Sequence, residues 1–417
     1  MLGMANFFHS LQMWLQQVGR SLNFLFLKES REDSEPEDSL LQLPQPLRQK
    51  LLDQLQALPS QPSYVEQLKT EFSPAFEAWC SKKQDYPHPN SWDTGCHDNV
   101  WVIVSPSVAN LPDVVDVFLQ SIADADSESD KELTYQGLPL RLMQLSARPD
   151  VKSLRKTLQQ QFSHRLSDER EVVIIPCLEN YFLRSVYGLE GIDYLREHLL
   201  NDPSRFWILG LGELGWKYLQ AIYALDAYSN QITHLSELSD EQLSDWFEPI
   251  VSKLNISFQS SSLRSKFTNK ELNWREKYFK TLADESDGID TVAIQLFLNT
   301  LQILENCSED SEQEQSATPK PSDGLQTYEI RAKSPKHPSL PDLPGESIYL
   351  LYALLLHRTL TKKELAEALG LAVEQIEHQI QTLRKTGVIE QKAQSLRLTP
   401  VYYPTVCNKL AGDNFTL

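Results

Sequence analysis

The sequence has few cysteines, and their arrangement excludes the two structures that cysteines most often build. Its 417 residues contain five cysteines, none of which forms a Cys-x-x-Cys pair. An odd, scattered set is unlike a disulfide framework, and the missing pair spacing argues against a structural zinc site. The nine histidines are dispersed and add no ligand cluster, so we expect no metal. A reducing, cytoplasmic location fits this usage best.

Long apolar runs are also missing. No run reaches the roughly 18 residues that a membrane-spanning helix needs, and there is no signal-peptide core with a cleavage site. Residues 1–28 are nevertheless predicted to form an amphipathic helix, because residues 4–28 lack acids and Phe7, Leu11 and Trp14 begin a stripe at helical spacing. Such a helix can lie in a membrane surface, at the inner face, or pack on protein.

Positive charge is scarce as well. The 39 Lys and Arg residues stand against 57 Asp and Glu residues, so the formal net charge is -18. The whole molecule should be repelled by nucleic acid and by anionic membranes unless its basic residues are segregated. Residues 347–417 hold eight basic and six acidic residues, a net charge of +2. The C-terminal region is therefore the candidate for nucleic-acid binding, although it is only weakly basic.

Strand-like and helix-like segments alternate in the middle of the chain, between residues 96 and 238. Residues 100–104 and 172–175 are nearly continuous apolar strands, and helical segments of ten or more residues separate them from three further strands. Runs of this kind indicate a parallel sheet with both faces covered. We therefore predict an α/β fold, a three-layer domain built from five βα units.

The C-terminal residues follow the pattern of a winged helix-turn-helix. An apolar helix at 347–357 precedes a second helix, which Thr361 and Glu364 begin as a capping box and which a glycine ends. A third helix, at about 373–385, has its apolar residues on one face, and two short strands around a polar turn at 391–395 follow as the wing. The pattern resembles the winged-helix domains of MarR-type regulators, including the Leu-Ala-Glu-Ala-Leu-Gly-Leu and Gly-Val-Ile-Glu segments.

Several segments between residues 100 and 305 resemble AAA+ and STAND P-loop NTPases. Residues 171–184 resemble the Walker B strand and its exit, 205–212 the sensor strand, and 278–293 the lid helices. The resemblance implies a P-loop-NTPase-like core with a helical lid, followed by the winged helix.

The phosphate-binding residues of that family are missing. A P-loop needs Gly-x-x-x-x-Gly-Lys-Ser/Thr, because its backbone N–H groups wrap the phosphates, its lysine neutralises them and its hydroxyl holds Mg²⁺. After Val104 this chain instead has Pro106 and Asp113, with no glycine or lysine between them. Pro176 stands in place of the Walker B aspartate, and Glu179 is the first candidate acid, with a solvated carboxylate as the alternative. We expect degenerate Walker motifs, no catalytic residues and no nucleotide hydrolysis.

The composition changes at several points, and these changes define the predicted domains. Residues 307–324 are acidic, rich in Ser and Pro and almost free of apolar residues, which predicts a disordered, loose tether. The predicted domains are an amphipathic helix (1–28), a spacer and helical region (29–95), the α/β domain (96–238), a helical lid (239–306), a disordered linker (307–345) and the winged helix-turn-helix (346–417).

One glycine motif suggests another ligand. Gly210, Gly212 and Gly215 form a Gly-x-Gly-x-x-Gly turn after the strand at 206–209 and before a helix, which is the context of a dinucleotide fingerprint that binds NAD. The turn follows the fourth strand rather than the first, and Trp216 replaces a usual small residue. A tight structural turn is the other interpretation, and we expect no cofactor.

These features leave three functions open. The first is a non-catalytic regulatory or scaffold protein, with a degenerate NTPase-like core and a winged helix that binds a protein partner or DNA. The second is a MarR-like transcriptional regulator whose third helix reads the major groove, and the third is a nucleotide- or NAD-dependent enzyme such as an ATPase. Two glutamates at the start of the third helix favour a protein partner. The predicted binding residues are Gln375, His378, Gln381, Thr382, Arg384, Lys385, Lys392 and Arg397.

Overall fold

The chain divides into two compact units, which we describe separately. The core unit contains residues 59–239, 285–293 and 337–417, and the small unit contains 1–58, 240–284 and 294–336. The predicted helix at 1–28 lies outside the described residues, as does most of the predicted linker. The computed structural model describes residues 40–43, 45–56, 58, 62–85, 99–124, 133–145, 148–163, 170–202, 204–229, 231–258, 269–304 and 329–415.

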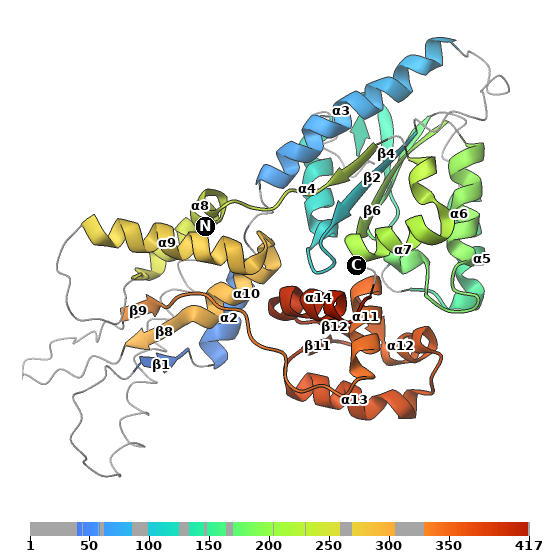
Figure 1. The fold of residues 1–417 in the computed structure, drawn as a ribbon. Coiled ribbons are helices and arrows are strands. Elements are labelled where there is room, and N and C mark those ends of the chain that lie inside the picture. Colours follow the sequence, from blue (N-terminus) through green and yellow to red (C-terminus); the bar gives the residue numbers. More distant parts are fainter. Residues whose placement is uncertain are drawn as a thin grey trace, which may run out of the picture. The chain divides into compact units, whose positions relative to one another are not determined.

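A six-stranded sheet forms the centre of the core unit (Figure 1). Its order is β3-β4-β5-β6-β2-β7, and every neighbouring pair is parallel except β3 and β4. All residues of β2, β5 and β6 are buried, which explains their continuous apolar sequences. The α/β prediction is confirmed. The strands are β2 (Val100–Ser105), β3 (Thr134–Tyr135), β4 (Leu138–Leu142), β5 (Glu171–Ile175), β6 (Arg205–Gly212) and β7 (Gln231–His234).

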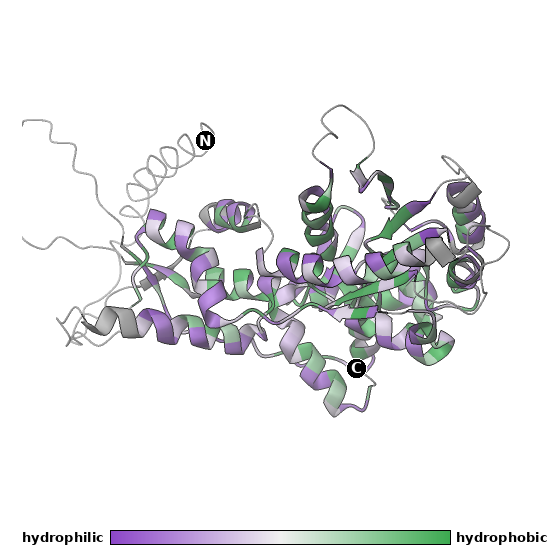
Figure 2. Ribbon diagram, turned by 90° about the horizontal axis from the view of Figure 1, so that it is seen from above, coloured by the Kyte–Doolittle hydropathy of each residue, from purple (hydrophilic) through white to green (hydrophobic). Residues whose placement is uncertain are grey.

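Helices cover both faces of this sheet, with α3 and α4 on one face and α5, α6 and α7 on the other (Figure 1). The hydropathy colouring of Figure 2 shows apolar residues along the central strands, whereas the helices carry both apolar and polar residues. This is the pattern of a buried sheet under amphipathic helices. The helices are α3 (Pro62–Asp85), α4 (Leu111–Ile122), α5 (Val151–Ser163), α6 (Glu190–Asn201) and α7 (Glu213–Tyr223).

Aromatic rings hold α3 against the sheet. The ring centroid of Phe72 lies 5.7 Å from that of Trp101 and 5.5 Å from that of Phe118. The indole N–H of Trp101 donates to the hydroxyl of Thr233 at 2.8 Å, so this fully buried ring has its polar atom satisfied. The same hydroxyl donates to the carboxylate of Glu71 in α3 at 2.8 Å. Helix α3 therefore belongs to the core unit and covers its edge strand β7.

Residues 346–415 fold into helices and a small antiparallel sheet of order β10-β12-β11. Helices α11 and α13 span the predicted residues, and the predicted capping box begins α12. The predicted turn at 391–395 is too long, because Gln391 and Lys392 pair with Leu396 and Ser395, which leaves a two-residue hairpin turn. The elements are α11 (Ser347–His357), β10 (Leu360–Thr361), α12 (Lys362–Leu369), α13 (Val373–Lys385), β11 (Ile389–Lys392), β12 (Ser395–Leu398), η4 (Pro400–Tyr402) and α14 (Tyr403–Gly412).

The prediction of a loosely tethered C-terminal region is wrong. Leu183 and Leu214 of the α/β part belong to the same buried apolar cluster as the core residues of α11, α12 and α13. Figure 1 shows α11 and α14 next to α7 at one end of the sheet. The expectation rested on linker composition, which carries no information about the surfaces that the linker joins.

The small unit corrects two further predictions. Its antiparallel sheet has the order β1-β8-β9; β8 lies in the region predicted as helix only, and β9 in the predicted disordered linker. Ile303 and Ile330 are buried, but β8 and β9 have only four residues each, too few for alternation to be recognised. Among the described residues, no helix combines the length and apolar character needed to cross a membrane. The elements are β1 (Leu40–Gln42), α2 (Gln45–Gln56), α8 (Asp240–Leu254), α9 (Asn269–Ser286), α10 (Asp290–Thr300, whose first turn belongs to the core unit), β8 (Leu301–Leu304) and β9 (Glu329–Ala332).

Candidate functional site

The loop between β2 and α4 contains the residues that the sequence comparison set against a P-loop. It turns tightly, since the N–H of Ala109 donates to the carbonyl of Pro106 at 3.0 Å. Two side chains from distant segments bind its carbonyls: the hydroxyl of Thr291 donates to Val108 at 3.2 Å, and the guanidinium of Arg358 donates to Ala109. The carbonyls of Val108 and Ala109 in this loop are therefore hydrogen-bonded within the protein.

Glu179, the first candidate acid, is fully buried rather than solvated. It lies in the 3-10 helix η2 (Leu178–Tyr181) after β5. One carboxylate oxygen accepts the N–H of Gly212, and the thiol of Cys177 donates to the other at 3.3 Å. Burial, followed by the charge of Glu179, raises the pKa of Cys177 to about 12, so the thiol keeps its proton at neutral pH. Both carboxylate oxygens of Glu179 therefore accept hydrogen bonds from the protein itself.

The predicted dinucleotide turn is closely packed against the protein. A Cβ atom at Gly210 would lie 2.7 Å from the carbonyl oxygen of Pro176. A Cβ atom at Gly212 would lie 3.0 Å from the Glu179 carboxylate and 3.1 Å from the Ser107 hydroxyl. In a dinucleotide site the second glycine lets the pyrophosphate approach the backbone. Here the side chains of Glu179 and Ser107 lie against that glycine instead.

The rest of this turn and the strand order support the same interpretation. A Cβ atom at Gly215 would lie 3.4 Å from the carbonyl oxygen of Leu356, so the third glycine lets α11 approach α7. The parallel strands run β4-β5-β6-β2-β7, whereas a Rossmann sheet has the order 3-2-1-4-5-6. Close packing explains all three glycines.

A buried arginine joins the α/β part to α12. The side chain of Arg148 is 2% exposed, and its guanidinium lies 3.1 Å from the carboxylate of Glu364. It also donates to the carbonyl of Glu179 at 2.7 Å. Glu364 in turn accepts the N–H of Thr361 at 2.6 Å within the capping box of α12. The residue that caps the helix therefore also binds the core.

The end of α11 is buried against the α/β part. The Nε2 atom of His357 accepts the N–H of Arg184 at 3.2 Å, and its ring centroid lies 5.0 Å from that of Phe182. Burial, and then the charges of Arg148 and Arg184, hold the pKa of His357 well below its ordinary value. The ring is therefore neutral at pH 7, which is the form that can accept this hydrogen bond.

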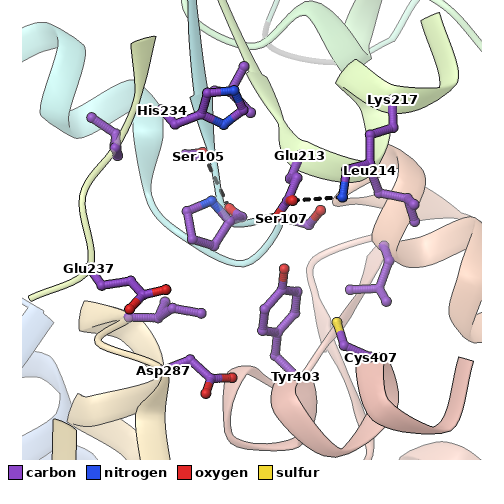
Figure 3. A pocket seen from close by; sticks show the side chains of 15 residues that line it. Ser105, Ser107, Glu213, Leu214, Lys217, His234, Glu237, Asp287, Tyr403 and Cys407 are labelled. Carbon is purple, nitrogen blue, oxygen red and sulfur yellow. Dashed lines mark hydrogen bonds and ion pairs between the residues drawn. The ribbon is translucent and has the colours of Figure 1, made fainter. Parts of the chain in front are cut away.

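A cavity of about 400 Å³ lies beside the β2–α4 loop, between the ends of β2 and β7, the start of α7 and helix α14 (Figure 3). Helices α4 and α7 leave neighbouring strands toward opposite faces of the sheet (Figure 1). Such a switch point at the carboxyl ends of the strands is where open α/β sheets bind ligands. We take this edge of the sheet as the candidate site.

The predicted partner-binding residues lie on α13 and the β11–β12 hairpin. Helix α13 is on the side of the C-terminal segment away from the large sheet (Figure 1). None of these residues lines the cavity. Gln375, His378, Gln381, Arg384, Lys385 and Lys392 are exposed, and Thr382 and Arg397 are half-buried.

Ion pairs change the charge of this surface. Lys362 lies 2.8 Å from Glu377, one of the two glutamates at the start of α13, and this contact lowers the pKa of that carboxyl. Glu374, the other, is exposed. Arg397 donates to Glu390 at 2.5 Å. The exposed positive charge is thus concentrated at the end of α13 and in the hairpin.

The contacts that the sequence did not reveal are those that join distant segments. Arg148 and Glu364 are 216 positions apart, and Arg358 and Ala109 are 249 apart. A single arginine in a loop resembles any solvated arginine, so no local pattern marks either contact. The described residues also contain no group of three or more metal-binding side chains.

Comparisons with known proteins give no family for this α/β chain. No family model matches, and no curated protein matches. Among solved structures, a RuvB variant of Thermotoga maritima is 13% identical (82% of this chain, 94% of that chain, TM-score 0.30). ORC2 of Aeropyrum pernix is 11% identical (82% and 95%, TM-score 0.33), and an E. coli HORMA:CdnC:Trip13 complex 12% (61% and 83%, TM-score 0.30). These are AAA+ and P-loop-NTPase-like folds, and the likeness is too distant to support further inference.

Asp290, at the start of α10, gives this region a pH dependence. Burial raises its pKa from 3.8 to about 6, although the N–H of Thr291 donates to it and Arg358 is near. The folded protein thus binds this proton more tightly than the unfolded chain does. Through this group, folded stability rises as the pH falls from about 6 to about 4.

We predict that Asp290→Asn raises the free energy of unfolding at pH 7 by about 2 kcal/mol, and that the gain vanishes near pH 4. Urea unfolding at both pH values measures it. Asp245→Asn, at an exposed carboxyl in α8, is the control and should change neither value. An equal gain at both pH values would show that the effect is not one of protonation.

Proposed function

We propose that this chain is a non-catalytic regulatory or scaffold protein, in which a degenerate NTPase-like core carries a winged-helix domain that binds a partner. The closed β2–α4 loop carries this proposal, because its carbonyls are bound by Thr291 and Arg358. A phosphate site needs converging N–H groups and a lysine at this position. Neither glycine nor lysine is present there, and Asp113 follows in the first turn of α4.

The C-terminal segment supports the second half of the proposal. Its order of helix, short strand, two helices and hairpin is that of a winged helix, which we assign to residues 346–417. Helix α13 corresponds to the recognition helix and the β11–β12 hairpin to the wing. Because α11 and α14 contact the α/β part, α13 is left for a partner (Figure 1).

A protein partner fits α13 best. Its exposed side chains include two amides and a histidine alongside Glu374, and the whole chain has a net charge of -18. Mixed polar groups of this kind form hydrogen bonds with a protein surface, whereas the acidic residue and the net charge oppose a phosphate backbone.

DNA is the second candidate, and the Lys362–Glu377 ion pair favours it. The pair neutralises one of the two glutamates that would face the DNA, and Arg384, Lys385 and Lys392 are exposed. A helix in the major groove uses its first residues to read bases, while basic residues bind the phosphates.

The absence of nucleotide binding is the first expectation to test. We predict that millimolar MgATP, MgGTP or NAD leaves the melting temperature of the full chain unchanged in a thermal-shift assay. A ligand at 100 times its dissociation constant would add about 2.7 kcal/mol, which such an assay detects readily. Saturable stabilisation by any of the three would contradict the proposal of a non-catalytic core.

For the DNA candidate, we predict that Arg384→Ala/Lys385→Ala weakens binding of the full chain to mixed-sequence duplex DNA and lowers the slope of log affinity against log salt by about 2. Fluorescence anisotropy at several salt concentrations measures both. Lys363→Ala/Lys409→Ala has the same charge change elsewhere on the segment and should keep the wild-type slope. No DNA binding by the wild type would eliminate DNA and leave the protein partner.

A further inference from the structure

The cavity beside the β2–α4 loop is built like a ligand site. Its volume of about 400 Å³ lies within the range of roughly 300–1,000 Å³ that is usual for small-molecule pockets. Part of its wall is apolar, from Val104, Leu214, Leu235 and Ile289. It lies at the switch point of the sheet, so its position and its lining both indicate a ligand.

The charges around this cavity select the kind of ligand. Three carboxylates line it, from Glu213, Glu237 and Asp287, against a single ammonium group, from Lys217. Lys217 lies 2.8 Å from Glu213, so these two charges neutralise each other. Glu237 and Asp287 lie together on the opposite wall (Figure 3). The cavity thus has an excess of negative charge, which repels phosphate and attracts a cation.

Asp287 responds to the charge of its neighbour. Its side chain is exposed at the cavity mouth, and partial desolvation, followed by the charge of Glu237, raises its pKa, while His337 acts against them. The Nδ1 atom of His337 lies 2.7 Å from the carboxylate of Glu285, a further acid beside this wall. His234 also lines the cavity and is exposed. A cation between the two carboxylates would relieve their repulsion.

A hydroxyl on the cavity wall completes the site. Ser107 lines the cavity and is only 4% exposed as a whole residue. The phenol of Tyr403 reaches up from α14 toward this loop (Figure 3). A hydroxyl on a cavity wall can both donate and accept hydrogen bonds. Ser107 could accept a hydrogen bond from an amine.

We propose that this cavity binds a small organic cation of the polyamine class, an aliphatic chain with primary ammonium groups. One ammonium group lies between Glu237 and Asp287, the methylene chain packs on the apolar wall, and a further amine donates to the Ser107 hydroxyl. The site occupies the position of a phosphate loop but has the opposite charge. It does not depend on what α13 binds.

Spermidine is the probe, titrated into the full chain by calorimetry at physiological ionic strength, which weakens non-specific attraction to an acidic protein. We expect saturable binding of one molecule and at least tenfold weaker binding by Glu237→Gln/Asp287→Asn. Glu241→Gln/Asp245→Asn is the matched control, with the same charge change at exposed positions of α8, and should bind as the wild type does.

Glu237→Gln alone, at an exposed position, guards against misfolding of the double variant and should itself weaken binding several-fold. Three results would overturn the proposal: no saturable binding of spermidine, equal weakening in the control variant, or stabilisation of the wild type by inorganic phosphate rather than by the amine.

Discussion

The buried guanidinium of Arg148 is the interaction on which the rest of this site depends. A charge that is removed from water is costly unless it is paired and hydrogen-bonded, and Arg148 meets this need with the carboxylate of Glu364 and the carbonyl of Glu179. The two partners come from opposite sides, one from α12 and the other from the turn after β5. Separating α12 from the turn after β5 would leave the buried guanidinium of Arg148 without one of its partners. The contact therefore fixes the position of the C-terminal segment on the α/β part.

Docking at this place determines what the carboxyl edge of the sheet can do. Arg358 follows α11 and reaches the β2–α4 loop, while α14 brings Tyr403 to the cavity. The same packing requires small residues at the glycine turn, where Leu356 approaches Gly215. This loop contains no glycine and no lysine, unlike a phosphate-binding loop, and carboxylates line the cavity beside it. The altered loop and the docked segment are therefore two parts of one arrangement.

Local patterns predicted the elements of this fold well. The apolar run at 347–357, the Thr361–Glu364 cap and the 3.6-residue spacing of α13 give the observed helices. The four-residue strands β8 and β9 escaped notice because they are too short to show alternation. The sequence also did not predict that the C-terminal segment packs on the α/β part. That packing depends on pairs such as Arg148–Glu364, which are distant in sequence and meet only in the folded chain. The glycine spacing predicted a tight turn, but only the structure shows that Glu179 and Ser107 lie against it.

A double-mutant cycle on Arg148 and Glu364 tests the docked arrangement most directly. The free energy of unfolding is measured for the wild type, Arg148→Ala, Glu364→Ala and the double variant. Loss of the helix cap occurs in both Glu364 variants and cancels in the cycle. Our account predicts a coupling energy of about 2 kcal/mol, because the pair is buried. Additivity within about 0.5 kcal/mol would show that the two residues do not interact and would contradict the docking of the C-terminal segment.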